Sequence, residues 1–568
     1  MDNAEIVFDV LVVGSGIAGL TAALSAAKSG LTVCVLEKDE ALGGTSAYSE
    51  AMAWIPCSRQ AKSLEIQDNF DSALQYLRHA GGGKVDEPSA KKYVETAAKA
   101  LEFLESNSPV RYELTRSSRD YHPLLPFSTL GARALSPKGF DGRRLKGRFR
   151  ELRWPLKSTL IFGGMTVTGE DLPHFYRVFR SVPSTLIVAR RFFRYLVDRC
   201  CGFPRGTAIT GGNAVVAGLL VELTSMGVPV LGNHRVVELT KSDTRVTGLR
   251  TVSSAEQSTQ LWKASRGVVL ASGGFANDRG RQAALYQHVA HGMPHRSLAP
   301  ASVEGDGADM ACMLGASFSA DLLQPAAWAP VSLVPIGSEL VPIPHFSDRA
   351  KPGVIAVTPN GKRFVNEACT YHQFVPAMID AASGRDDAGA FLVCDYRAIR
   401  KYGLGAVPPF PGRTTPFIRS GYLQQAESIE VLAQVLGIDR HALAATVEQH
   451  NEDAARGVDS LFGKGSDDYQ RDNGDPEIVP NPCLAPIAKA PFFAIRILPG
   501  DLGTFAGIRT NENAQVLDAT ETPIAGLYAC GSDKASALGG AYPGAGIGVG
   551  AGITFAYIAG RHLAGLPS

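Results

Sequence analysis

The feature that most constrains the fold is a strand–helix–strand unit near the start of the chain. Residues 7–13 form a short apolar, β-branched run bounded by glycine, which is typical of a buried parallel strand. Residues 14–19 read Gly-x-Gly-x-x-Gly, and the alanine-rich residues 20–29 predict a helix. A second strand is expected over residues 31–36, directly before Glu37. This βαβ order predicts an open α/β sheet.

The glycines and the acidic residue of this unit fit a dinucleotide. Glycines let the backbone approach a pyrophosphate, and the start of the helix supplies N–H donors with a partial positive charge. Glu37 ends the second strand, where an acidic side chain accepts hydrogen bonds from an adenosine ribose. The unit alone does not separate FAD from NAD. The residues expected to contact the dinucleotide here are Gly14, Ser15, Gly16, Ala18, Gly19 and Glu37.

Length and composition predict an ordinary globular protein of more than one domain. The chain has 568 residues and 60.2 kDa, which is long for one core, so we expect two domains with one interrupting the other. A net charge of +1 gives no global attraction to nucleic acid. The nine cysteines include no CxxC pair, which argues against a zinc site and a disulfide framework and favours a reducing cytoplasm. We expect no metal.

The beginning of the chain and its apolar runs predict a cytoplasmic protein. Residues 1–9 are acidic and lead directly into a strand, unlike the basic and then apolar order of a signal peptide. No uncharged apolar run reaches about 18 residues, the length that a membrane-spanning helix needs.

The dinucleotide domain is predicted to be discontinuous. A helix over 211–226, a series of strands between 229 and 252 and a further strand over 267–271 resume the sheet pattern. They follow a stretch at about 142–205 in which basic residues far outnumber acidic ones and alternate with Phe and Tyr. Such a stretch fits a membrane surface or a docked partner, although a solvated helical face or internal ion pairing is commoner. No recognised nucleic-acid module surrounds it.

Three tyrosines stand in settings that suit chemistry. Tyr542 lies in the turn Ala-Tyr-Pro-Gly-Ala-Gly at 541–546, where a hydroxyl and glycine-freed N–H groups suit an oxygen that gains negative charge. Tyr371 follows a polar cluster in a proline-rich region that begins near Leu322 and predicts a separate mixed domain. Tyr121 interrupts a helical pattern. For Tyr121 and Tyr371, ordinary half-buried or core tyrosines remain alternatives.

Two stretches resemble the flavoprotein superfamily that shares the fumarate reductase flavoprotein fold. They are residues 42–47, just after Glu37, and residues 526–533 near the end of the chain. In that superfamily the first passes the flavin ring and phosphates, and the second reaches the ribityl chain and the ring. The first lacks the histidine that tethers FAD in some members, so the resemblance implies noncovalent FAD. It assigns further cofactor contacts to Lys38, Gly43, Gly44, Thr45, Ser46, Val236, Ser272, Gly273, Gly274, Asp306, Gly531, Ser532, Asp533, Gly546 and Ile547.

Four separated motifs, in order, resemble the 3-ketosteroid delta-1 dehydrogenases, and the resemblance covers essentially the whole chain. They are Asp120-Tyr121 followed by prolines, Asn366-Glu367 followed by Tyr371, residues 500–504, and residues 542–546. The resemblance implies a ketosteroid substrate, an unidentified electron acceptor and a place in steroid degradation and lipid metabolism.

Catalytic roles then follow from the resemblance. Tyr542 and the Gly546 N–H would bind the C3 ketone, Tyr371 would take the C2 proton, and a hydride would pass from C1 to flavin N5. Ionising a phenol of pKa about 10 near pH 7 costs about 4 kcal/mol, so the base needs help. The resemblance gives that role to Tyr121.

Departures from the family pattern and the rival functions define the alternatives. Residues 49–51 and 547–551 differ from the usual family sequence, so we expect altered flavin contacts there. A fumarate-type reductase is disfavoured because residues 503–507 lack the His-Thr pair. A delta-4 (5-alpha) dehydrogenase is disfavoured because Tyr121 and the Tyr-Pro-Gly turn are both present. A flavin-bound scaffold that docks a partner is the non-enzyme alternative.

The predicted architecture is α/β with an α+β cap. A discontinuous Rossmann-like FAD domain is expected over residues 1–320 and 508–568, with the basic helical insertion at about 142–205. The substrate and catalytic cap is expected over residues 321–507.

Overall fold

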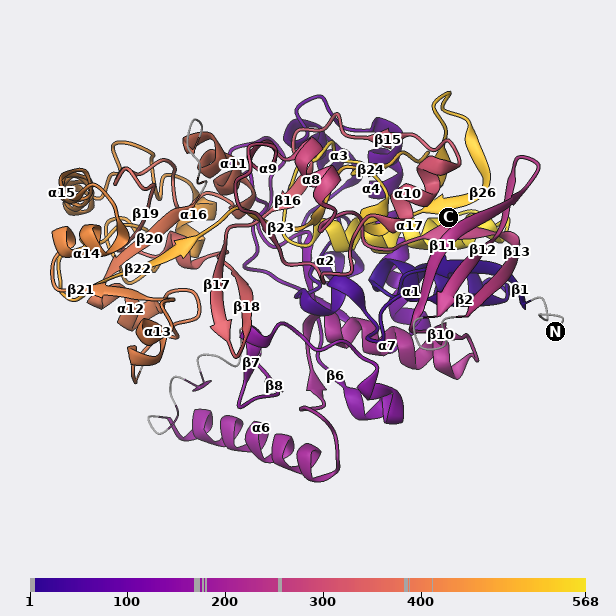
Figure 1. Cartoon of the computed structure of the whole chain (residues 1–568), viewed down its shortest axis with the longest axis horizontal. Helices are drawn as coiled ribbons and strands as arrows, with labels where there is room; N and C mark the ends of the chain where they lie inside the picture. Colours follow the sequence, from indigo (N-terminus) through magenta and orange to yellow (C-terminus); the bar gives the residue numbers. More distant parts are fainter. Residues whose placement is uncertain are drawn as a thin grey trace. The chain divides into compact units, whose positions relative to one another are not determined.

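The computed structural model shows that the chain forms two compact units (Figure 1). The structure describes residues 6–167, 174–175, 178, 181–253, 258–382, 387, 389–410 and 412–568. Unit 1 comprises Met1–Arg279, Ala299–Ala326 and Gly503–Ser568, and unit 2 comprises Gly280–Leu298 and Ala327–Leu502. Residues 280–298, which lie inside the predicted FAD domain, therefore pack with unit 2. The functional assignment of the domains stays a prediction.

An eight-stranded sheet is the centre of unit 1. Its strand order is β10-β2-β1-β13-β12-β11, with β26 beside β13 and β25 beside β26. The strands β2, β1, β13 and β26 run parallel, and Val12 lies opposite both Val35 and Val269. The strands are β1 (Ile6–Val13), β2 (Val33–Leu36), β10 (Val230–Leu231), β11 (His234–Ser242), β12 (Arg245–Ser253), β13 (Thr259–Leu270), β25 (Gln515–Leu517) and β26 (Pro523–Ala529). The predicted βαβ unit and the resumed sheet are confirmed.

Helices from both ends of the chain cover this sheet. In Figure 1 the indigo α1 lies beside the yellow α17, and α1 also packs against α7. A Cβ atom added at Gly560 of α17 would lie 2.6 Å from the Ser25 side chain of α1, so only glycine permits this close packing. The helices of unit 1 are α1 (Ile17–Lys28), α2 (Arg59–Ser63), α3 (Phe70–Ala80), α4 (Glu87–Asn107), α6 (Val182–Cys200), α7 (Gly211–Ser225), α10 (Asp306–Met313) and α17 (Ile547–Leu563).

Short ladders complete unit 1. They are β3 (Ala53–Trp54) and β4 (Tyr112–Leu114) on either side of β5 (Ala134–Pro137), β6 (Phe140–Asp141) with β9 (Ala208–Ile209), β7 (Leu160–Ile161) with β8 (Met165–Thr166), and β15 (Phe318–Ser319) with β24 (Gly507–Ile508). The basic insertion is thus a mixture of short elements and the long helix α6. Its residues 168–173, 176–177 and 179–180 lie outside the described residues. Among the helices that the structure describes, none has the length and apolar character needed to span a membrane.

Unit 2 is built on the antiparallel sheet β19-β20-β22-β21. Alternate residues of its strands face two different cores. Val354 and Leu392 pack with Phe374 of α11, whereas Ile355 and Val393 pack with Leu432 of α14. Helices therefore cover both faces of the sheet. Its strands and the adjoining hairpin are β17 (Val331–Ile336), β18 (Glu339–Pro344), β19 (Val354–Val357), β20 (Ala390–Asp395), β21 (Gln424–Ala426) and β22 (Phe492–Ile497).

The remaining described elements of unit 2 are helices and three short strands. Within the unit, Arg296 and Ser297 of β14 pair in parallel with Gly500 and Asp501 of β23. The elements are α8 (Arg279–Leu285), α9 (Gln287–Ala290), β14 (Arg296–Ser297), β16 (Ala326–Trp328), α11 (Tyr371–Ala381), α12 (Tyr396–Tyr402), α13 (Thr415–Arg419), α14 (Ile429–Leu436), α15 (Arg440–Arg456), α16 (Asp468–Asn473) and β23 (Gly500–Thr504).

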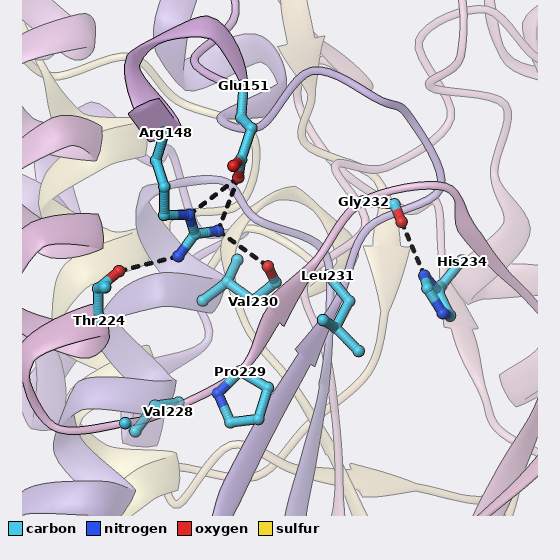
Figure 2. A pocket seen from close by; sticks show the side chains of 10 residues that line it. Arg148, Glu151, Thr224, Val228, Pro229, Val230, Leu231, Gly232 and His234 are labelled. Atoms are coloured by element: carbon cyan, nitrogen blue, oxygen red, sulfur yellow. Dashed lines mark hydrogen bonds and ion pairs between the residues drawn. The ribbon is translucent and has the colours of Figure 1, made fainter. Parts of the chain in front are cut away.

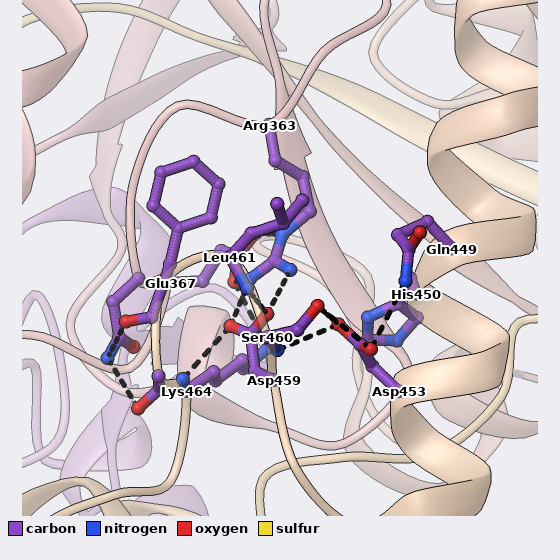
Figure 3. Close-up of polar contacts among 12 residues, drawn as sticks. Arg363, Glu367, Gln449, His450, Asp453, Asp459, Ser460, Leu461 and Lys464 are labelled. Carbon is purple, nitrogen blue, oxygen red and sulfur yellow. Dashed lines mark hydrogen bonds and ion pairs between the residues drawn. The ribbon is translucent and has the colours of Figure 1, made fainter.

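A buried ion network ties the loop after β19 to the loop after α15 (Figure 3). Arg363 donates to both Glu367 oxygens at 2.7 Å and to both Asp459 oxygens at 2.8 and 2.9 Å. The Lys464 Nζ donates to the Val354 carbonyl at 2.6 Å and lies 3.7 Å from Glu367 Oε2. Burial alone would raise the pKa of Glu367, but Arg363 and Lys464 outweigh it and lower the pKa. The Glu367 carboxyl group is therefore held ionised.

The substitution Glu367→Gln should lower the free energy of unfolding by about 3–5 kcal/mol, because it removes one of the two carboxylates that balance the buried Arg363 and Lys464. Urea denaturation measures this loss. The same network lowers the pKa of Asp459 to about 2, against burial, which raises it. Its contribution should be complete above the unfolded pKa of about 3.9 and should disappear as the pH falls toward 2. In contrast, Glu238→Gln, in an exposed pair with Arg250, should change stability by less than about 0.5 kcal/mol. Equal losses in both variants would contradict this account.

Candidate functional site

The turn after β1 requires glycine at two positions. Gly14 has a φ of +105°, and a Cβ there would lie 2.2 Å from the Ala271 carbonyl oxygen. A Cβ at Gly19 would lie 2.0 Å from the Gly14 carbonyl oxygen. Gly16 is the residue before α1, and Ala18 lies in its first turn. The first backbone N–H groups of a helix have no partner within the helix, and the partial positive charge there favours a phosphate.

Glu37 joins the glycine turn to the end of β2. Its Oε2 atom accepts from the Ser15 N–H at 3.0 Å and from the Ser15 hydroxyl at 2.7 Å. Its Oε1 atom accepts one hydrogen bond in the described part of the chain, from the Asp39 N–H at 3.1 Å. A carboxylate oxygen accepts more than one hydrogen bond, so Glu37 retains capacity for ribose hydroxyl groups. Ser15 also accepts from the Gly43 N–H at 2.9 Å, which connects the next predicted segment.

Residues 43–46 cross the start of α1. Gly43 and Gly44 have φ values of +116° and +50°, and a 3₁₀ turn over Gly44–Tyr48 contains Thr45. The Ser46 hydroxyl accepts from the Ile17 N–H of α1 at 3.0 Å. The two glycine-rich stretches thus form one surface.

Two further loops join this surface at the carboxyl ends of β13 and β26. Asp533 accepts from the Ser272 N–H at 2.5 Å and from the Gly274 N–H at 2.9 Å. Burial raises the pKa of Asp533, although these donors act in the opposite direction. Gly531 approaches α1 so closely that a Cβ there would lie 3.0 Å from the Ala18 Cβ. The predicted residues Gly273 and Ser532 lie in the same two loops.

The outer predicted contacts surround the end of β2. Lys38 pairs with Asp306 at 2.5 Å, and Arg235 pairs with the same carboxylate at 2.9 Å. Val236 lies buried on β11. All the predicted cofactor residues belong to unit 1, and the loops at the carboxyl ends of β1, β13 and β26 form a cradle that fits a dinucleotide.

The structure brings two of the three predicted tyrosines together. The rings of Tyr121 and Tyr542 stack with centroids 5.5 Å apart and an interplanar angle of 15°. The Tyr121 N–H donates to the Pro543 carbonyl at 2.9 Å, and the Tyr76 hydroxyl donates to the same carbonyl at 2.7 Å. The Phe505 ring lies 5.9 Å from the Tyr542 ring. The turn at 541–546 is therefore fixed against the loop that carries Tyr121.

Asp120 supports this arrangement, a role that sequence reasoning missed. It accepts from the Trp54 indole N–H at 2.8 Å and from Arg133 at 2.9 Å. Gly544 packs on the same indole, because a Cβ there would lie 2.6 Å from the Trp54 ring. Burial raises the pKa of Asp120, whereas Arg133 and Trp54 lower it. The only signal in the sequence was the position of Asp120 directly before Tyr121.

Gly546 has to be glycine for two reasons. Its φ is +87°, and a Cβ would lie 2.3 Å from the Met52 carbonyl group. It is the residue before α17, and Ile547 is the buried first residue of that helix. The backbone N–H groups here point out of the start of a helix, as an oxyanion donor requires.

Tyr371 lies in unit 2 as the first residue of α11. Thr370 and Gln373 form a capping box that fixes the start of this helix. The Tyr371 side chain is 7% exposed, and its ring lies 4.8 Å from the Phe346 ring. The meeting of Tyr371 with Tyr121 and Tyr542 stays a prediction.

A second polar cluster in unit 2 was not predicted. His295 bonds to Asp501 at 2.7 Å, and His288 bonds to His295 at 3.1 Å. Burial, with His295 nearby, lowers the pKa of His288 to about 3, so His288 is neutral. The cluster fastens the segment before β14 to β23. Among the residues that the structure describes, no three His, Cys, Asp or Glu side chains are grouped to hold a metal ion.

A cavity of about 520 Å³ lies at the edge of the unit 1 sheet, beside β10 (Figure 2). Its lining includes none of the predicted site residues. Arg148 is bonded there to Glu151, to the Thr224 hydroxyl at 2.8 Å and to the Val230 carbonyl at 2.9 Å. The His234 ring bonds to the Gly232 carbonyl at 2.7 Å. These polar groups stabilise the sheet edge.

Comparison with known proteins defines the class. A family model described as an FAD binding domain matches residues 9–549, so the cradle belongs to a flavoprotein that binds FAD. The chain is 36% identical over 570 residues to 4-oxocyclohex-2-ene-1-carboxylate 5-dehydrogenase of Sinomonas cyclohexanicum, covering 100% of this chain and 95% of that protein. It is 32% identical over 568 residues to 3-oxosteroid 1-dehydrogenase of Mycolicibacterium smegmatis, covering 98% and 97% of the two chains.

A solved structure agrees with these relatives. The 3-ketosteroid delta1-dehydrogenase from Sterolibacterium denitrificans, in complex with 1,4-androstadiene-3,17-dione, superposes with a TM-score of 0.89 at 33% identity, covering 98% of this chain and 99% of that one. The protein belongs to the 3-oxosteroid 1-dehydrogenase family of FAD-dependent oxidoreductases.

The substitution Glu37→Gln should raise the Kd for FAD about tenfold, because a charged acceptor for the ribose becomes neutral. Titration of the apoprotein followed by flavin fluorescence measures this. Glu40→Gln, at an exposed position three residues later, should leave the Kd unchanged. An unaltered Kd in both variants would show that Glu37 serves only to hold Ser15.

Proposed function

We propose that the protein uses FAD to introduce a double bond between C1 and C2 of a 3-ketosteroid. The observation that carries this proposal is the stacked pair Tyr121 and Tyr542, on a turn that ends at the obligatory Gly546, in the same unit as the FAD cradle. The sequence identity of 32–33% to ketosteroid dehydrogenases, over 98% of this chain, supports the proposal.

The ketone oxygen is bound by the Tyr542 hydroxyl and the Gly546 N–H in this proposal. Both groups donate hydrogen bonds, and both stabilise the negative charge that forms on this oxygen as C2 loses a proton. A donor of this kind contributes about 2.7–4 kcal/mol to the transition state. The ring contact with Phe505 and the hydrogen bonds to Pro543 hold the turn in place before substrate binds.

Tyr371 is the proposed base and Tyr121 its assistant. Tyr371 takes the C2 proton as the C1–C2 double bond forms, and Tyr121 assists loss of the Tyr371 hydroxyl proton. FAD, when bound, supplies the acceptor for the hydride that leaves C1. The cofactor residues hold the flavin noncovalently in this proposal, and an unidentified acceptor takes the two electrons afterwards.

A monocyclic 4-oxo carboxylate is the second candidate substrate. The relative that is named as a dehydrogenase of such a compound shares 36% sequence identity with this chain. The 3-oxosteroid 1-dehydrogenase of Mycolicibacterium smegmatis shares 32%. The two candidates share the cyclic ketone and the same C–H bonds beside it, so the oxyanion donors and the base serve either one. They differ in the bulk and charge of the remainder of the substrate.

Anaerobic mixing of the holoenzyme with each candidate tests the function. A 3-ketosteroid should bleach the flavin absorbance, and the product should carry the new double bond at C1–C2. Bleaching by 4-oxocyclohexanecarboxylate or its 2-ene alone would transfer the assignment to the second candidate. A flavin that stays yellow with every cyclic ketone would favour a scaffold that docks a partner.

The substitution Tyr371→Phe should slow flavin bleaching about 10²- to 10⁴-fold, because it removes the general base. Tyr542→Phe should slow it about 10²- to 10³-fold and weaken ketone binding, because it removes an oxyanion donor. Stopped-flow absorbance measures both rates, and both variants should retain FAD. The matched control is Tyr396→Phe, a partly buried tyrosine on α12. Near-normal turnover in the Tyr371 variant would remove it as the base.

We also propose that the basic insertion contacts an anionic membrane surface through α6. Only Ser184 and Asp198 of this helix are buried, and both are polar. Val182, Leu186 and Phe193 lie on the opposite face and are 65–74% exposed. The helix also carries four arginines, Arg190, Arg191, Arg194 and Arg199. An apolar face with basic residues beside it suits anionic lipid, although internal pairing, as of Arg194 with Asp141, is the alternative.

Sedimentation with vesicles tests this contact. The protein should pellet with phosphatidylserine-containing vesicles more than with pure phosphatidylcholine, and Leu186→Glu with Phe193→Glu should abolish pelleting. Val431→Glu, which replaces an exposed apolar residue of α14 in unit 2, should have no effect. No pelleting of the unaltered protein would assign α6 to a solvated surface.

A further inference from the structure

Arg349 is a buried arginine whose guanidinium donates to four backbone carbonyls of unit 2. It is 1% exposed and lies just after β18. Its Nε donates to the His345 carbonyl at 2.9 Å, and one Nη donates to the Phe346 carbonyl at 3.0 Å. The same Nη also donates to the Cys369 carbonyl at 3.2 Å, and the other Nη donates to the Glu367 carbonyl at 2.7 Å. One side chain therefore joins two distant segments.

These two segments flank Tyr371. Phe346, on the first segment, places its ring 4.8 Å from the Tyr371 ring. Cys369, on the second, precedes Tyr371 by two residues. The Arg349 guanidinium also lies 4.6 Å over the ring of Phe374, the fully buried residue that follows Tyr371 by three positions on α11. Arg349 thus contacts the residues before, beside and after the tyrosine.

The backbone that Arg349 contacts is itself held firmly. Glu367 is fixed by Arg363 and Lys464 (Figure 3). Asn366 donates to the Phe462 and Gly463 carbonyls at 3.2 and 3.1 Å. Asn366 also accepts from the Ala368 N–H at 2.9 Å, and the Thr370–Gln373 capping box follows directly. The bond from Arg349 to Cys369 adds the connection between this stretch and the segment that places Phe346 against Tyr371.

The chemistry of this position favours arginine specifically. The planar guanidinium carries five N–H donors in a fixed arrangement, so it can reach four carbonyls on two segments at once. A lysine ammonium is compact and cannot span them. Burying a cation is costly, and an apolar side chain could fill the same volume without that cost. The arrangement is therefore better explained by the need to fix the geometry of the carbonyls.

We propose that Arg349 is the positioning residue for Tyr371, holding the phenol in the orientation needed to remove a proton from the substrate. The inference rests on the proposed function, in which Tyr371 is the base. Proton transfer requires the phenol oxygen within hydrogen-bond reach of its proton, and a displacement of about 1 Å can cost about 100-fold in rate. Arg349 does not contact the substrate in this scheme. It acts through Tyr371.

The test combines Arg349→Met with the conservative Arg349→Lys. The Met variant should lower kcat for the dehydrogenation about 100-fold with KM changed less than about threefold, since ketone binding belongs to unit 1. The Lys variant should recover part of kcat. Deuterium at C2 should give a larger isotope effect in both variants than in the unaltered enzyme, because proton removal becomes slower. Deuterium at C1 should not.

A matched control separates positioning from stability. Asn451→Ala removes hydrogen bonds with both the N–H and the carbonyl of Ile487, in the same unit but away from Tyr371. It should lower the Tm while leaving kcat and both isotope effects unchanged. If Arg349→Met and Asn451→Ala lower Tm equally and neither changes the C2 isotope effect, Arg349 is only structural.

A readout independent of catalysis distinguishes failure of this inference from failure of the proposed function. With 3-fluorotyrosine at position 371, one sharp fluorine resonance is expected, which broadens or splits in Arg349→Met. If no ketone bleaches the flavin absorbance, the proposed function is wrong. The fluorine resonance still decides whether Arg349 orders the Tyr371 ring. An unchanged resonance and unchanged kcat overturn the inference. Should the Met variant not fold, Arg349→Lys and Phe346→Leu, each with the same two measurements, decide.

Discussion

The close approach of backbone segments at the carboxyl ends of parallel strands is the constraint on which unit 1 depends. Gly14 allows the turn after β1 to lie against the Ala271 carbonyl, and Gly19 allows α1 to lie against the Gly14 carbonyl. Glu37 then accepts from Ser15 in the turn after β1, and Asp533 accepts from Ser272 and Gly274 in the loop after β13, so each carboxylate fastens a glycine-rich turn to the end of another strand. Side chains larger than hydrogen would separate these turns. In the predicted cofactor site the same absence of side chains leaves room for phosphates, so packing and the predicted binding share one cause.

The turn at residues 541–546 depends on the same close approach of backbone segments. Gly544 and Gly546 allow the backbone to lie against Trp54 and Met52, and Asp120 connects Trp54 to the loop of Tyr121. The stacked Tyr121 and Tyr542 rings are therefore fixed by backbone contacts on both sides. Unit 2 fixes its loop with polar contacts instead of close backbone packing. There, buried charges around Arg363 and carbonyl bonds from Arg349 order the loop that leads to Tyr371.

The sequence predicted the parts of the fold that have local signals. The βαβ unit, the later strands and the glycine turns were recognisable because hydrophobic period, helix propensity and left-handed φ values are properties of short stretches. The pairing of Tyr121 with Tyr542 was expected only from a family resemblance. Trp54, Arg133 and Arg349 could not be predicted, because their partners lie far away in the sequence. Asn366 and Glu367 were recognised as a polar cluster before Tyr371, and the structure shows Glu367 bonded to Arg363 and Asn366 bonded to Gln470 of α16. Residues 280–298 joined unit 2 through long-range contacts such as the β14–β23 pairing.

The position of β26 has a consequence for how the polypeptide is made. This strand, with the Asp533 loop and α17, completes the cofactor cradle, yet it comes from the last segment of unit 1, Gly503–Ser568. A ribosome releases β13 hundreds of residues earlier than its partner β26. The nascent chain must therefore keep an unfilled sheet edge and an open cradle until residues 503–568 have been synthesised, and stable retention of the yellow cofactor has to wait for that segment.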